Sequence, residues 1–184
     1  MIWECSFLSR NKMKYFVALL CSFLLSCSVK KEELVAYRMD MDNHIFWEDP
    51  TPRNIISDPA AYSGRFVCRL DSLFQYSPTF QARLSSISKR TVSSVILSGW
   101  FKRENNFAQP QLVIEIKNGD GVTMEWLMKG FEGRTSDTMR WTYLESEIDL
   151  IEKSRNRPDN IYRIYVMNTK GAFTLLDDFQ IVFY

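Results

Sequence analysis

Short runs in which apolar and polar residues alternate make up most of the chain after residue 60. Alternation of this kind is typical of strands with one buried face. Turn residues separate the runs, and Asn118-Gly119-Asp120-Gly121, between two alternating runs, predicts a β-hairpin. The predicted strands cover residues 65–70, 92–102, 111–117, 122–128, 140–144, 161–167 and 173–183. Because no segment after residue 27 shows a sustained helical period, the sequence predicts an all-β fold of two packed antiparallel sheets.

The run from residue 122 to 128 carries its apolar residues at the even positions, which include Met124 and Trp126. We therefore expect this face to be buried, with Thr123 and Glu125 facing water. On this reading Trp126 is a core residue.

An export signal is predicted at the start of the chain. Lys14 is followed by an apolar run over residues 15–25 and then by Ser26-Cys27, which is the layout of a secretory signal. The run is shorter than the roughly 20 residues of a membrane-spanning helix. The alternatives are a plain signal peptide or a buried helix. We expect residues 1–26 to be the signal, of which 1–12 form an upstream extension before Met13, residues 27–43 to be a polar tether, and residues 44–184 to be the domain.

The end of this segment, Leu24-Leu25-Ser26-Cys27, resembles the lipobox of bacterial lipoproteins. The resemblance implies cleavage before Cys27 and attachment of lipid to its thiol. Ser28 in the following position implies delivery to the outer membrane, on either of its two sides. The resemblance therefore implies that the protein binds the membrane through its lipid anchor.

Charge and cysteine content exclude several functions. The formal net charge is +1, and residues 1–26 contribute +2, so the rest carries about −1 and offers no basic stripe for nucleic acid. Cys68 would be the one cysteine outside the signal and the anchor, and we expect it to be a buried small side chain. His44 is the sole histidine, so no His-based catalytic triad can form.

Five segments, in order, resemble the galactose-binding-like jelly rolls that include many carbohydrate-binding modules. They are Ala61-Tyr62-Ser63-Gly64, Leu97-Ser98-Gly99-Trp100-Phe101-Lys102, Arg140-Trp141-Thr142-Tyr143, Ile164-Tyr165-Val166-Met167-Asn168 and Leu175-Leu176-Asp177-Asp178-Phe179. The resemblance implies a two-sheet antiparallel jelly-roll β-sandwich, and a non-catalytic role in binding carbohydrate. It also implies that Trp141 is a packing residue, because the matching position of the family is usually in the core.

Asp177 and Asp178 interrupt an apolar strand. Asp177 shares parity with Phe179, so an unbroken strand would point its carboxylate into the core, where an unpaired charge is costly. In the family that the chain resembles, a structural Ca²⁺ often compensates such a pair, with a Glu from a Phe-Glu-like strand that Phe46-Trp47-Glu48 matches with one residue inserted. Oxygen ligands from Glu48, Asp177 and Asp178 would suit Ca²⁺. The alternative is a bulge or turn that leaves both carboxylates in water or on backbone N–H groups.

For sugar binding, the sequence favours Trp100 with Lys102. Ser98 and Lys102 share the face of Trp100, while Leu97 and Phe101 form the other face. An aromatic ring with polar neighbours suits the apolar face and hydroxyl rim of a sugar. The alternative is a ring that faces solvent or lies under a loop.

Glu147, Asp149 and Glu152 match the bulged active-site strand of laminarinase-type glycosidases, as nucleophile, helper and acid/base. Only 32 residues follow Glu152, where those enzymes place much of a sheet, so the sequence argues against catalysis. We therefore expect a non-catalytic, lipid-anchored module of the cell envelope that binds carbohydrate. The main alternative is a structural or partner-binding envelope lipoprotein that contacts another envelope protein and no glycan.

Overall fold

The computed structural model describes residues 31–42, 48, 53–132 and 138–184. The chain divides into two units, Met1–Glu32 and Glu33–Tyr184, and everything below concerns the second. Its elements are β1 (Val35–Met39), β2 (Ile55–Ser57), β3 (Phe66–Leu70), β4 (Phe80–Arg83), α2 (Leu84–Ile87), β5 (Ser94–Arg103), β6 (Pro110–Lys117), β7 (Thr123–Gly130), β8 (Trp141–Asp149), β9 (Ile161–Asn168) and β10 (Thr174–Phe183). Among the described residues, no helix has the length and apolar content needed to span a membrane.

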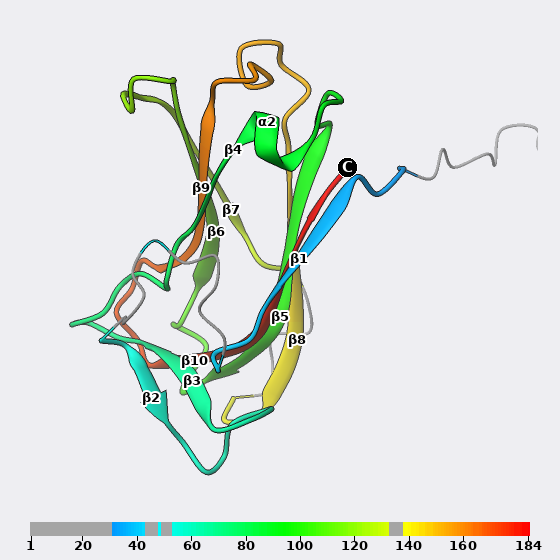
Figure 1. Ribbon diagram of the computed structural model, residues 1–184. Coiled ribbons are helices and arrows are strands. Elements are labelled where there is room, and N and C mark those ends of the chain that lie inside the picture. The colour runs from blue at the N-terminus through cyan, green and yellow to red at the C-terminus, as the bar shows by residue number, and fades with distance from the viewer. Residues whose placement is uncertain (1–30, 43–47, 49–52, 133–137) are drawn as a thin grey trace, which may run out of the picture. The chain divides into compact units, whose positions relative to one another are not determined.

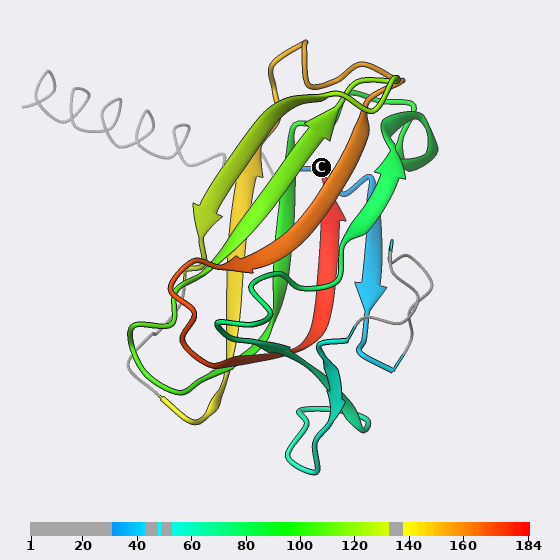
Figure 2. The same cartoon turned by 90° about the vertical axis from the view of Figure 1, so that its left-hand side faces the viewer.

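The strands form two antiparallel sheets that face each other (Figure 1). The first sheet has the order β2-β3-β10-β5-β8, with β1 also paired to β10, and we call it sheet A. The second has the order β4-β9-β6-β7, and we call it sheet B; it is the nearer layer in Figure 2. This arrangement confirms the predicted fold class, a two-sheet antiparallel jelly-roll sandwich.

The core lies between the sheets, and its residues come from alternate positions of the strands. Large side chains that are almost fully buried fill it, among them Phe80, Phe101, Leu112, Ile114, Tyr162, Phe179 and Phe183. Cys68 is also fully buried, and this burial raises the pKa of its thiol, so the thiol stays protonated. The interpretation of Cys68 as a small core residue is confirmed.

The hairpin predicted at residues 118–121 is present and joins β6 to β7. The Asn118 side-chain oxygen accepts hydrogen bonds from the backbone N–H groups of Asp120 at 3.1 Å and Val122 at 2.9 Å. Gly121 has φ of 82°, a conformation that glycine adopts without strain. The turn therefore depends on the two residue types, Asn and Gly, that predicted it.

One boundary predicted from the sequence is wrong. Residues 35–39 were expected to lie in the tether, but they form β1, whose Val35 pairs with Phe183 and whose Met39 pairs with Phe179. The physical reason is the alternation of Val35, Tyr37 and Met39, which places a row of apolar side chains on the core. The compact unit thus begins about ten residues earlier than position 44. The signal residues, Cys27 and His44 lie outside the described residues.

Candidate functional site

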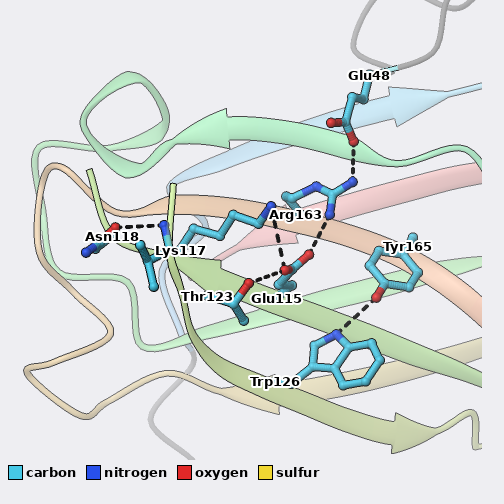
Figure 3. Close-up of polar contacts among 9 residues, drawn as sticks. Glu48, Glu115, Lys117, Asn118, Thr123, Trp126, Arg163 and Tyr165 are labelled. Atoms are coloured by element: carbon cyan, nitrogen blue, oxygen red, sulfur yellow. Dashed lines mark hydrogen bonds and ion pairs between the residues drawn. The ribbon is translucent and has the colours of Figure 1, made fainter. Parts of the chain in front are cut away.

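An open groove lies on the outer face of sheet B, which faces away from the core. Its volume is about 400 Å³, and it is lined by Tyr76, Thr79, Glu115, Trp126, Arg163 and Tyr165. A second hollow of about 400 Å³ adjoins it, shares Tyr76 and Thr79 with it, and includes Glu48 and Arg53. Figure 3 shows the polar contacts that organise this face.

The strand register brings the central residues of the groove together. In β6, Ile114 and Ile116 point into the core, so Glu115 between them points outward. Glu115 is paired with Arg163 of β9 on one side and with Trp126 of β7 on the other. A cation, an anion and an indole ring therefore lie in one row across the sheet.

Aromatic side chains form one part of the groove. The Trp126 ring is 53% exposed, and its Nε1 donates a hydrogen bond to the Tyr165 hydroxyl at 3.0 Å (Figure 3). Tyr165 is buried, which raises the pKa of its phenol, and its ring meets that of Tyr76 edge to face at 5.8 Å. The indole is thus held in a fixed orientation while about half of its surface stays open to solvent.

Charged side chains form the other part. The Arg163 guanidinium binds Glu115 at 2.6 Å through one terminal nitrogen and Glu48 through the other. Thr123 donates a hydrogen bond to Glu115 at 2.5 Å, and the Lys117 ammonium lies 3.7 Å from the same carboxylate. Burial alone would raise the pKa of Glu115, but the hydrogen bonds from Thr123 and Arg163 and the two nearby cations lower it overall. The carboxylate is therefore ionised at neutral pH.

The predicted orientation of β7 is wrong. Its even-numbered side chains, which were expected to be buried, are exposed; they are Met124, Trp126 and Met128, with Val122 just before the strand. Leu127 instead packs on the core, and Glu125 turns the other way to receive two hydrogen bonds from Arg155 at 2.7 and 2.6 Å. The reason is that β7 is the edge strand of sheet B, where Arg155 supplies the charge that Glu125 needs on the inner side.

Trp100 and Lys102, the residues favoured by the sequence, lie on the outer face of sheet A. Tyr62 stacks on the Trp100 ring with the centroids 3.9 Å apart and the planes 16° apart, so a loop residue covers one face of the indole. Trp141, which was read as packing, donates a hydrogen bond from Nε1 to the Ala60 carbonyl at 2.9 Å and so holds the same loop. The structure does not bring Trp100 and Lys102 together with the groove on sheet B.

The residues named for calcium do not come together. A break in strand register follows Asp177, and Asp178 has φ of 48°, so Asp177 lies on the opposite face of β10 from Phe179. Backbone N–H groups of Ser63 and Asp178 donate to the Asp177 carboxylate at 3.0 and 2.8 Å. Burial raises the pKa of this carboxyl, and those hydrogen bonds act in the opposite direction.

The other two proposed calcium ligands have cationic partners. Asp178 lies 3.6 Å from Arg38, and Glu48 binds Arg163 on sheet B. Within the part of the chain that the structure describes, no three His, Cys, Asp or Glu side chains gather where they could hold a metal ion. The alternative considered for Asp177, a bulge with backbone donors, is the one observed, and these residues do not fit a shared calcium ion.

The three residues considered for glycoside hydrolysis do not lie on one strand. Glu147 and Asp149 share the outer face of β8, as their alternation predicts. Glu152 follows the strand and pairs with Arg155 at 3.3 Å, the same arginine that binds Glu125. Glu152 therefore lies beyond the end of the strand that carries Glu147 and Asp149, and its side chain is 65% exposed.

The protein is an all-β sandwich, and aromatic side chains line an open groove on the outer face of its sheet B. No family model and no curated protein matches the sequence. Similar solved structures include carbohydrate-binding modules. The CBM22-1 xylan-binding domain of Xyn10C from Paenibacillus barcinonensis is 16% identical, with a TM-score of 0.45, and the match covers 83% of this chain and 94% of that one. The xylan-binding module CBM15 is 16% identical, with a TM-score of 0.45 over 81% of this chain and 96% of that one.

A third similar structure is the CBM22-1-GH10 portion of xylanase 10B from Clostridium thermocellum, complexed with xylohexaose. It is 9% identical, with a TM-score of 0.46, and the match covers 84% of this chain but 29% of that longer chain. The likeness concerns architecture, and what this chain binds has to be argued from its own side chains.

Sequence reasoning missed most of the groove. Trp126 was considered and assigned to the core, while Tyr76, Glu115, Arg163 and Tyr165 were not singled out. The available signal was charge inside apolar strands, because Glu115 lies between two isoleucines and Arg163 lies between Tyr162 and Ile164. Both of these charged residues point outward and mark the outer face of their strands, whereas Glu125 of β7 points inward because Arg155 pairs with it.

Proposed function

We propose that the chain is a non-catalytic glycan-binding module and that the groove on sheet B is its binding site. The observation that carries the proposal is the half-exposed Trp126 ring, held by Tyr165 beside the polar pair of Glu115 and Arg163. A pyranose has apolar C–H faces and a rim of hydroxyl groups, so it needs a fixed ring to stack on and charged groups to bind its hydroxyls.

The open form of the groove favours the interior of a polysaccharide chain over a chain end. The Trp126 groove continues past Tyr76 and Thr79 into the adjoining hollow. Tyr76, which is 49% exposed, lies between the two spaces and offers a second aromatic surface. Neighbouring sugars of one chain would occupy the two hollows in turn.

The test is the affinity of the wild type and a Trp126→Ala variant for xylan, glucomannan, β-glucan and pectin, measured by calorimetry. Stacking on one face of a half-exposed indole removes roughly 80 Å² of apolar surface from water, or about 2 kcal/mol, so the variant should bind roughly 30-fold more weakly. Trp126→Phe keeps a ring but loses the hydrogen bond to Tyr165, and it should fall between the two.

Tyr143→Ala is the matched control. Tyr143 is 47% exposed but lies on β8 of sheet A, so removing its ring should leave glycan affinity unchanged. If Trp126→Ala binds every glycan as the wild type does, or if none of the glycans binds the wild type, the proposed function is wrong.

We also propose that the module is tethered to the cell envelope, as an outer-membrane lipoprotein, by lipid on Cys27. Support comes from the sequence alone, from the apolar run that ends in Leu24-Leu25-Ser26-Cys27. Cys27→Ser should move the protein from the membrane fraction to the soluble fraction, and mass spectrometry of the wild type should show acyl chains at a new N-terminus. An intact leader, or unchanged membrane attachment of the variant, would contradict the anchor.

A surface that binds another envelope protein is the second candidate. It is favoured by the exposed Met124 and Met128, which flank Trp126 and extend the apolar surface along β7. Methionine-rich surfaces of this kind adapt to protein partners. Crosslinking through the thiol of a Met128→Cys variant would reveal such a partner. This candidate is favoured only if none of the glycans in the panel binds.

A further inference from the structure

We infer that the groove on sheet B selects glycans that lack carboxylate groups, and that Glu48 and Glu115 enforce this selection by occupying its arginine. The inference rests on the proposed glycan binding and adds the chemical class of the ligand. It concerns the sugar that would stack on Trp126.

The guanidinium that would ordinarily recognise an acidic sugar is already in use. Both terminal nitrogens of Arg163 hold carboxylates, Glu115 at 2.6 Å and Glu48 on the other side. The remaining nitrogen, Nε, is buried and has no hydrogen-bond partner, so it is not accessible to a ligand in the groove. Since bidentate recognition of a carboxylate needs two free N–H groups on one edge of the guanidinium, Arg163 has no edge to offer.

A second cation near the groove is paired as well. Lys117 lies 3.7 Å from Glu115, so both cations of this network are paired with carboxylates, and the Glu48 carboxylate is its most exposed charge. Arg53 and Glu48 both line the adjoining hollow, and neither is among the residues that line the Trp126 groove itself. A ligand on Trp126 therefore meets no unpaired cation among the residues that line the groove.

What the network does present to a ligand is acceptor oxygen. The Glu48 side chain is 44% exposed, and Arg163 uses one of its oxygens. Hydroxyl groups of a neutral sugar can donate to such oxygens. A sugar carboxylate has no proton to donate at neutral pH and would meet like charge, which disfavours binding.

The experiment compares pairs of oligosaccharides that differ only in charge. Cellohexaose is paired with a glucuronan hexamer, and mannohexaose with a mannuronan hexamer; in each pair a carboxylate replaces each hydroxymethyl group. By calorimetry at neutral pH, we expect the neutral member of the pair that binds to be favoured at least about tenfold. Added NaCl should strengthen binding of the acidic member, because it screens repulsion, and leave the neutral member unchanged.

The deciding variant is Glu48→Gln, which removes the negative charge paired with one terminal nitrogen of Arg163 without changing the size of the side chain. The ratio of neutral to acidic affinity should fall by about tenfold or more. Glu145→Gln is the control: Glu145 is exposed on β8 of sheet A, so the same loss of charge away from the groove should not change the ratio. Melting temperatures of both variants check that the fold is retained.

The outcomes separate this inference from the proposed function. If the wild type binds both members of a pair equally, or binds the acidic member more tightly, in a manner that depends on Trp126, the selection is wrong and the glycan site stands. An unchanged ratio in Glu48→Gln also contradicts the role of Glu48. If no glycan of the panel and neither member of any pair binds, or if binding does not depend on Trp126, the proposed function fails and the inference fails with it.

Discussion

Replacing Gly99 with alanine tests how closely Phe179 of β10 packs against the backbone of β5. Gly99 lies in β5, on the core face between Leu97 and Phe101, and β5 pairs with β10 and β8. A Cβ atom at this position would lie 2.5 Å from Cδ1 and 3.0 Å from Cε1 of Phe179, and 3.3 Å from the carbonyl oxygen of Asp177. Phe179 is buried, so its ring cannot move toward solvent to make room.

Overpacking of this kind costs about 1–3 kcal/mol of the free energy of unfolding. Alanine restricts the unfolded chain and returns about 0.5 kcal/mol, which leaves a net loss of about 1.5 kcal/mol. For a compact unit that spans residues 33–184, this corresponds to a fall in melting temperature of about 3–6 °C. Calorimetry and urea unfolding would measure both quantities.

Gly130→Ala is the matched control, because Gly130 also lies in a strand and nothing lies within 4 Å of its added Cβ. Its unfolding free energy should stay within about 0.5 kcal/mol of the wild type. Combining Gly99→Ala with Phe179→Leu should cost less than the sum of the single changes, because the smaller side chain makes room. If Gly99→Ala melts like the wild type, or if the two changes add without coupling, the close approach of Phe179 is wrong.

Three further predictions follow from the contacts described above. Trp100→Ala should lower the melting temperature by several degrees, because it removes the ring on which Tyr62 stacks, and should leave glycan affinity unchanged; lost affinity at unchanged stability would restore Trp100 as the sugar contact. A chelator should not shift the melting temperature, since backbone N–H groups hold Asp177, and a clear fall would show that a metal stabilises the fold. The hydrogen bond from Arg155 lowers the pKa of Glu125 in the folded state, so its stabilisation is present above about pH 4.5 and is lost as the pH falls through the folded pKa. Glu125→Gln should therefore reduce stability at pH 7 by about 1–2 kcal/mol and flatten the acid limb of the stability profile; an unchanged acid limb would contradict the ion pair.

The long strands could be predicted because their alternation is regular and their turns carry Asn and Gly. The strands that were missed, β1, β2 and β4, are short, with three to five residues each, although β3, also of five residues, was predicted at 65–70. In β1 the alternation of Val35, Tyr37 and Met39 was present but lay within a charged segment. Only the pairing with β10, which is distant in sequence, decides that this segment is a strand.

The site was harder to predict because alternation distinguishes two faces without saying which one is inside. In β7, the face with Met124 and Trp126 is more apolar than the face with Leu127, so the sequence predicted that the first face is buried. The partner strand carries the deciding information, since Glu115 in β6 points outward and Trp126 is its neighbour. Asp177 was misplaced for a similar reason. The register break after it exchanges the inward and outward positions of the preceding residues of β10, and alternation alone does not reveal such a break.

The early start of β1 determines how far an anchored domain can move. The backbone N–H of Leu34 already donates to the Phe183 carbonyl at 2.8 Å. If Cys27 carries lipid, only residues 28–33 separate the bilayer from the first hydrogen bond of the sheet, and they span about 20–25 Å when fully extended. A linker of that length would keep the module close to the membrane surface, so it would bind only polysaccharide that lies near the bilayer.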